Sequence, residues 1–277
     1  MSRQGSRRRG LWALSLAGIG IVAVLAGCQK NSAPNRQFQK SYQQTSRLDT
    51  GIIGGTDAKG TESFASSVVG LGTRSGSGYT IDCTGTLIGA NTVVTAGHCM
   101  RPLSNFHVVF GLRDDSTLQG RPIINAVAHE DYSMWFPEDA RDVHDIGIVQ
   151  FSGGLPVGYA PAPILPDDSV LANGTAVILA GYGMNDGRAQ TGSGVLRYTE
   201  VPIAESNFGQ TEIRTDEHKA GSCAGDSGGP GFVFSGGQYY VWGVTSRGDT
   251  LCNEEGIYTK INSYRAWIQQ KTAAWMN

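Results

Sequence analysis

The chain has 277 residues, of which 40% are hydrophobic and 17% are charged, and its formal net charge is -2 at pH 7. This length and apolar content allow a large buried core and exclude a wholly disordered chain. The near-neutral charge gives no sign of a nucleic-acid-binding protein.

The first thirty residues differ in composition from the rest of the chain. Basic MSRQGSRRRG is followed by apolar LWALSLAGIGIVAVLAG and then by Cys28. This order is typical of an export signal, with a single membrane-spanning anchor as the alternative. Residues 25–28 resemble the lipobox of bacterial lipoproteins. That resemblance implies a signal peptide over residues 1–27 and a lipid on the new N-terminal Cys28.

Residues 28–51 are polar and rich in Gln and Ser, and they show no apolar periodicity. We expect a flexible tether that joins the lipid-attachment cysteine to the remainder of the chain. The protein is then an exported one, either anchored to a bacterial membrane as a lipoprotein or periplasmic or secreted.

Four further cysteines follow, and all four lie in the exported part of the chain: Cys83, Cys99, Cys223 and Cys252. An even number of cysteines in an exported chain indicates two disulfides, and four cysteines allow three pairings. A zinc site is the weaker interpretation, because the sequence contains neither CxxC nor HExxH.

Beyond residue 51 the chain consists of short β-branched or aromatic runs separated by Gly, Asn, Asp and Pro. Examples are residues 92–95, 106–110, 123–128, 146–151, 176–180, 238–245 and 257–261. This spacing predicts an antiparallel sandwich or barrel and not alternating βαβ units. One helix is predicted at the end, where five residues fall at spacings near three and four: Tyr264, Trp267, Ile268, Lys271 and Trp275.

The stretch CAGDSGGP at residues 223–230 places Ser227 in the composition of a tight turn. A serine hydroxyl becomes a useful nucleophile only beside a base that a third group orients. GDSGG also matches the nucleophile elbow of α/β-hydrolases, in which the histidine follows the serine. All five histidines of this chain precede Ser227, so the elbow is excluded.

Three segments in the order His, Asp, Ser together resemble the chymotrypsin/trypsin family of serine endopeptidases. They are NTVVTAGHC with His98, HDIGIVQF with Asp145, and CAGDSGGP. IIGG at residue 52, GYG at 181–183, GVTSRG at 243–248, GIYTKI at 256–261 and SYRAWI at 263–268 extend the resemblance to the C-terminal helix. It implies an all-β protease domain over residues 52–277, with two six-stranded antiparallel β-barrels and a C-terminal helix.

The resemblance also implies a role for each residue of the site. Ser227 attacks the peptide carbonyl, His98 accepts its proton, and Asp145 orients His98. Ser246 donates a hydrogen bond to that aspartate, and the N–H groups of Gly225 and Ser227 form the oxyanion hole.

Several alternatives accompany this assignment. Asp142 is the alternative acid, but no apolar strand follows it directly. The remaining histidines are expected to be structural: His107, His129, His144 and His218.

The disulfide pairs implied by the same resemblance are Cys83 with Cys99 and Cys223 with Cys252. The first closes a loop of about sixteen residues and fixes His98, and it stabilises the fold by about 3 kcal/mol in the chain-entropy model. The second braces the substrate pocket.

Activation is implied as well. In the family, cleavage creates an N-terminal ammonium, here that of Ile52, which pairs with the aspartate before the serine, here Asp226. An unpaired buried carboxylate is costly, so the uncut chain is expected to be a zymogen with residues 28–51 as its propeptide. Residues 48–51 contain no Arg or Lys, which indicates a separate activating protease and not self-activation by a trypsin-like specificity. The cut would also release the domain from Cys28.

The substrate pocket is expected to be open and uncharged. Its base falls at Gly221, where cleavage after Arg or Lys needs a carboxylate, and the other matching positions are Ser222, Gly248 and Gly256. This pattern predicts cleavage after medium or large apolar residues. Arg247 and Asp249 either alter neighbouring subsites or lie on a solvated loop, and the remaining acidic residues are expected in solvated loops.

The leading hypothesis is therefore an exported, monomeric serine endopeptidase that acts on protein or peptide substrates. Residues 112–115 lack the leading glutamate of the family's calcium loop, so no metal or cofactor is expected. The alternative from another class is a catalytically silent, protease-like binding or adhesion module at the cell surface.

Overall fold

A computed structural model describes residues 52–115, 117–137 and 139–275. The predicted signal peptide, the lipid-attachment Cys28 and the polar tether lie outside these residues and stay predictions. Within the described ranges, no helix combines the length and the apolar character that crossing a membrane requires.

The first barrel contains six antiparallel strands. They are β2 (Val68–Ser75), β3 (Gly78–Gly89), β4 (Thr92–Thr95), β5 (Phe106–Phe110), β6 (Gln119–Ala128) and β7 (Gly147–Phe151). The strand order is β2-β3-β4-β7-β6-β5, and β5 pairs with β2 to close the barrel. Its interior is filled by alternating apolar side chains such as Val69, Leu71, Val108 and Phe110, all of which are buried.

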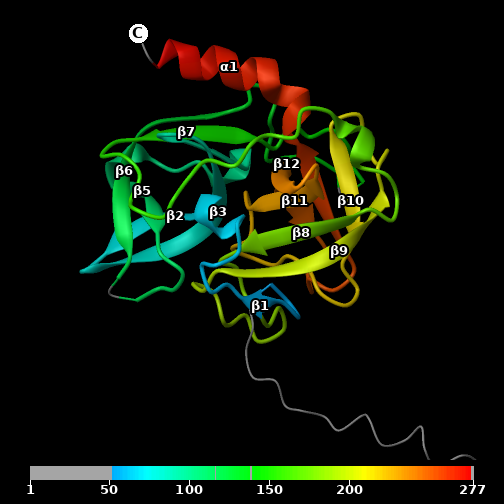
Figure 1. The fold of residues 1–277 in the computed structure, drawn as a ribbon, viewed down its shortest axis with the longest axis horizontal. Coiled ribbons are helices and arrows are strands. Elements are labelled where there is room, and N and C mark those ends of the chain that lie inside the picture. Colours follow the sequence, from blue (N-terminus) through cyan, green and yellow to red (C-terminus); the bar gives the residue numbers. More distant parts are fainter. Residues whose placement is uncertain (1–51, 116, 138, 276–277) are drawn as a thin grey trace, which may run out of the picture. The chain divides into compact units, whose positions relative to one another are not determined.

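The second barrel also has six antiparallel strands. They are β8 (Ala176–Gly181), β9 (Arg197–Glu205), β10 (Glu212–Asp216), β11 (Pro230–Ser235), β12 (Gln238–Gly248) and β13 (Glu255–Lys260). Pairing of β9 with β8 closes this barrel, and the short β1 (Thr56–Asp57) adds to β9 from outside. Ile52, Trp242 and Tyr258 are among the buried residues of its core. The predicted pair of six-stranded barrels is confirmed (Figure 1).

Short helices connect the strands. The 3-10 helices are η1 (Ala65–Ser67), η2 (Gly97–Cys99), η3 (Leu103–Asn105), η4 (Asp168–Val170) and η5 (Ile261–Tyr264), and the α-helix is α1 (Arg265–Ala274). The predicted C-terminal helix is therefore present. It is anchored by Ile268, which is buried, and by Trp267, whose indole N–H donates to Glu130 at 2.7 Å. Lys271 also forms an ion pair with Glu130.

The strands predicted from β-branched runs agree well with the observed ones. Residues 92–95 and 106–110 coincide with β4 and β5, whereas the run at 123–128 is only the end of β6. β6 extends back to Gln119 because Gln119–Pro122 pair with residues of β5. Local composition carries no such pairing signal.

Candidate active site

His98 lies on η2, directly after β4 ends. Its backbone N–H donates to Oδ1 of Asp145 at 3.0 Å, and its ring Nδ1 lies 2.7 Å from Oδ2 of the same carboxylate. The neighbouring Cys99 is joined by a disulfide to Cys83 of β3, which fastens η2 to the barrel wall. Strand end, disulfide and two hydrogen bonds therefore fix the position of the imidazole.

Asp145 precedes β7 and is only 2% exposed. Besides the two donors from His98, its Oδ2 accepts the hydroxyl of Ser246 on β12 at 2.8 Å. Three donors satisfy the buried carboxylate, and its charge favours the imidazole form with hydrogen on Nδ1. The other ring nitrogen of His98 is then free to act as a base.

Ser227 lies in a segment that the first barrel holds in place. Thr84 of β3 donates its N–H to the Ser227 carbonyl at 2.8 Å and its hydroxyl to the Gly225 carbonyl at 2.9 Å. The Ser227 carbonyl also lies 3.5 Å from Sγ of Cys99, the residue after His98. These contacts bring the serine segment beside η2.

The backbone of this segment requires glycine. Gly225 has a φ of +99°, in the region that side chains disfavour, and a Cβ there would also approach Gly183. Within the described ranges, the N–H groups of Gly225 and Ser227 donate to no protein atom. Two neighbouring free N–H groups are the geometry that stabilises an oxyanion.

Asp226 points away from this pair, into the protein, and is 1% exposed. Its carboxylate accepts the N–H groups of Gly183 at 2.7 Å and Cys223 at 2.9 Å. Burial raises the pKa of Asp226 to about 7 despite these two hydrogen bonds, and the negative charge of Glu217 raises it further. Among the described residues, Asp226 forms no ion pair.

A cavity of about 230 Å³ opens beside Ser227. Its walls come from the serine segment, β12 and the loop that follows: Ser222, Cys223, Ala224, Ser227, Thr245, Ser246, Arg247, Gly248, Asp249, Thr250 and Cys252. Cys223 and Cys252 form the second disulfide and thereby join the two sides of the cavity.

The expectation for the floor of this cavity needs correction. Ser222 and Gly248 line it, but Gly221 and Gly256 do not. A Cβ at either glycine would overlap the carboxylate of Glu217, a residue that is 2% exposed. The prediction that the remaining acidic residues lie in solvated loops is therefore wrong for Glu217.

The Arg247 side chain is only 15% exposed and does not lie on a solvated loop. Its guanidinium binds both carboxylate oxygens of Glu212, at 2.7 and 2.9 Å, and the Ala140 carbonyl at 2.7 Å. Glu212 is fully buried and also accepts the N–H groups of Asp142 and Val143. The ion pair links β12, next to Ser246, to β10, and its hydrogen bonds with residues 140, 142 and 143 hold the loop that leads to Asp145. Glu212 carries no sequence signal for this role, because an isolated glutamate on a strand usually faces water.

The alternative acid, Asp142, lies elsewhere. Its carboxylate accepts the backbone N–H groups of Gln210 and Thr211 and the Thr211 hydroxyl. Burial alone would raise its pKa, but these hydrogen bonds lower it overall. Asp142 therefore fixes a loop, and Asp145 is the acid beside His98.

The other histidines have local partners. His129 stacks on His144 with ring centres 5.2 Å apart, and Nδ1 of His144 lies 2.8 Å from the Tyr264 hydroxyl. His218 contacts Asp216 at 2.8 Å, and His107 packs against the ring of Tyr79.

The described ranges contain one group with the spacing of a metal site. It consists of His98 with Cys83 and Cys99, whose sulfur atoms are joined in the disulfide. A disulfide offers no thiolate, so this group does not have the donors of a zinc site.

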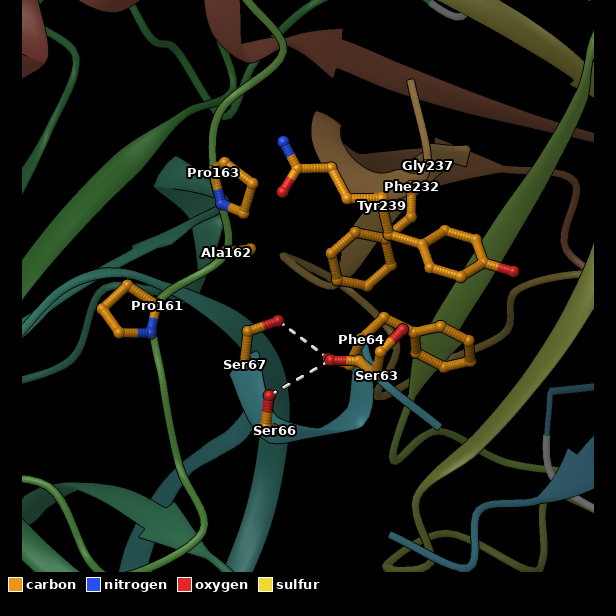
Figure 2. Close-up of a pocket in the computed structure, with 11 residues that line it drawn as sticks. Ser63, Phe64, Ser66, Ser67, Pro161, Ala162, Pro163, Phe232, Gly237 and Tyr239 are labelled. Atoms are coloured by element: carbon orange, nitrogen blue, oxygen red, sulfur yellow. Dashed lines mark hydrogen bonds between the residues drawn. The ribbon is translucent and has the colours of Figure 1, made fainter. Parts of the chain in front are cut away.

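A second cavity, of about 220 Å³, shares no lining residue with the first. Figure 2 shows it between η1, the segment 161–163 and the hairpin of β11 and β12. The hydroxyls of Ser66 and Ser67 donate to carbonyls of their own turn, those of Ser63 and Phe64. This cavity presents no acid and base pair and is not a second candidate for catalysis.

Comparison with known proteins extends over both barrels. The family model described as Trypsin matches residues 52–268. Chymotrypsin-like elastase family member 1 of Homo sapiens is 29% identical over 260 residues, covering 86% of this chain and 98% of the relative. The protein of the same name from Canis lupus familiaris is 28% identical over 259 residues, with 86% and 98% covered.

Proposed function

Because the chain belongs to the trypsin family of serine proteases, we propose that it is a serine endopeptidase acting on protein or peptide substrates. One observation carries this proposal: Ser246, Asp145 and His98 are joined by hydrogen bonds, and the residue after His98, Cys99, has its Sγ 3.5 Å from the Ser227 carbonyl. That arrangement supplies the oriented base that a serine nucleophile needs.

The reaction follows from these positions. His98 removes the proton of the Ser227 hydroxyl while the serine oxygen bonds to the substrate carbonyl carbon. The carbonyl electrons move onto its oxygen, where the N–H groups of Gly225 and Ser227 stabilise the charge. Asp145 stabilises the imidazolium. His98 then protonates the leaving amine, the C–N bond breaks, and water hydrolyses the acyl-enzyme by the reverse proton path.

We further propose that the protein is exported as a zymogen and activated by another protease at Gly51–Ile52. Two observations support the switch: Ile52 is fully buried in the core of the second barrel, and buried Asp226 has no cationic partner among the described residues. A new ammonium at Ile52 would supply that cation. Export and a lipid on Cys28 rest on the N-terminal sequence, as does release of the monomeric domain from the membrane upon cleavage.

The preference for apolar residues stays a prediction, but its premise has changed. It required a pocket base without a carboxylate, and the Glu217 carboxylate lies against Gly221, the position expected to form that base.

A fluorophosphonate probe tests the enzyme directly. We expect labelling of Ser227 after cleavage before Ile52, much slower labelling of the uncut chain, and none of the Ser227→Ala variant. Ser227→Ala should also lower turnover about a million-fold. Correctly cut protein that the probe does not label would contradict the proposal and favour a silent binding module.

A further inference from the structure

Glu217 brings a carboxylate behind Ser222, a residue that lines the cavity, from an unexpected place in the chain. It directly follows β10, and its backbone N–H donates to the Glu254 carbonyl at 2.9 Å. Its carboxylate fills the volume that side chains at positions 221 and 256 would need. Glycine at both positions therefore makes room for a side chain that enters from β10.

Four donors hold this carboxylate. Ser222 donates its N–H at 2.6 Å and its hydroxyl at 3.0 Å to Oε2, while Thr215 and Tyr258 donate hydroxyls to Oε1 at 2.7 and 3.1 Å. Burial raises the pKa of Glu217, and these hydrogen bonds lower it. The Ser222 hydroxyl donates to Glu217, and Ser222 lines the cavity, so the lone pairs of this hydroxyl can accept a hydrogen bond from an incoming group.

The charge around the cavity is unbalanced. Within the described ranges, Glu217 has no cation within ion-pair distance, and the neighbouring buried Asp226 has none either. Arg247 is neutralised by Glu212, and the carboxylate of Asp249 accepts backbone N–H groups of its own loop. A buried carboxylate without a counter-ion is costly, and a ligand that brings a cation relieves that cost.

We propose that the cavity binds a lysine or arginine side chain on the acyl side of the scissile bond, and that Glu217 determines this specificity. The inference rests on the proposed endopeptidase activity, because the side chain beside the attacked carbonyl is the one that reaches a cavity next to Ser227. The cation donates a hydrogen bond to the Ser222 hydroxyl and is attracted by the negative charge of the Glu217 carboxylate behind it. The sequence prediction of an apolar preference would then be replaced.

The test uses the cut enzyme and matched peptides that differ at one residue, arginine against its neutral isostere citrulline and lysine against norleucine. A charge-assisted hydrogen bond in place of a neutral one predicts a kcat/KM ratio of about 10- to 100-fold in favour of each cation. Glu217→Gln should bring both ratios close to one. Glu217→Asp keeps the charge at a shorter reach and should retain a partial preference for the cation. It provides the test if the Gln variant does not fold.

Asp249→Asn is the matched control, since Asp249 lines the same cavity with a carboxylate. We expect it to keep the preference for the cation. A cut enzyme that the fluorophosphonate labels but that favours leucine or norleucine overturns the specificity and leaves the proposed function standing. Loss of the preference in Asp249→Asn, with the preference kept in Glu217→Gln, also overturns the role of Glu217 and leaves the proposed function standing. Absence of labelling in cut protein overturns the proposed function itself, and the specificity with it.

Discussion

Asp226 should give the uncut chain an unusual pH dependence of stability. Its carboxyl is fully buried, and burial raises its pKa from 3.8 to about 7. Between pH 3.8 and pH 7, the Asp226 carboxyl therefore carries a proton in the folded state and has lost it in the unfolded state. Stability from this group is complete below pH 3.8 and is lost as the pH rises toward 7. At about 1.4 kcal/mol for each pKa unit, the loss is about 4 kcal/mol.

Urea unfolding of the Ser227→Ala protein between pH 4 and pH 8 measures this loss, with the Ser227→Ala/Asp226→Asn protein as the reference. The asparagine loses part of the hydrogen bonding to Gly183 and Cys223, which shifts its curve by a constant amount. Glu217 also has a raised pKa and is present in both proteins, so the part of its contribution that is independent of Asp226 cancels in the difference. The difference in free energy of unfolding should change by about 4 kcal/mol over this range.

Cleavage before Ile52 should remove the effect, because the new ammonium lowers the pKa of Asp226. A Gly51→Arg change lets trypsin make that cut, and mass spectrometry verifies the new N-terminus. A difference between the two uncut proteins that stays constant within about 1 kcal/mol, or a stability that rises with pH through Asp226, would show that the pKa of Asp226 is not raised by burial.

Two further substitutions test the residues around Asp145. Arg247→Met removes the partner of the fully buried Glu212 and should lower the free energy of unfolding by about 3 to 5 kcal/mol. The double variant Arg247→Met/Glu212→Leu should restore most of that loss. A single Arg247→Met variant as stable as the parent would contradict this prediction. Ser246→Ala removes one of three hydrogen bonds to the Asp145 carboxylate and should lower kcat/KM about 10- to 100-fold, with KM nearly unchanged in steady-state assays. An effect on KM alone would show that Ser246 acts in substrate binding.

The sequence predicted the site residues that lie within short, recognisable motifs. His98, Asp145 and Ser246 are far apart in the chain, yet each lies within a recognisable segment, and the structure brings the three together. Strands with β-branched runs, such as β4 and β5, were also predictable, because their local composition and their pairing agree.

The environments of Glu212 and Glu217 could not be predicted in this way. Whether a glutamate is buried depends on donors that other strands bring to it, here Arg247 of β12 for Glu212 and Tyr258 of β13 for Glu217. The sequence shows that positions 221 and 256 are glycines and therefore leave space for another side chain. Only the fold shows which distant carboxylate uses the space.

Each end of the described chain packs against the barrel that is farther from it in sequence. β1, before the first barrel in sequence, pairs with β9 of the second, and α1, after the second barrel, contacts Glu130, which follows β6 of the first. During synthesis, the first barrel therefore lacks its contacts with α1 until the last residues have left the ribosome. Such long-range closure slows folding.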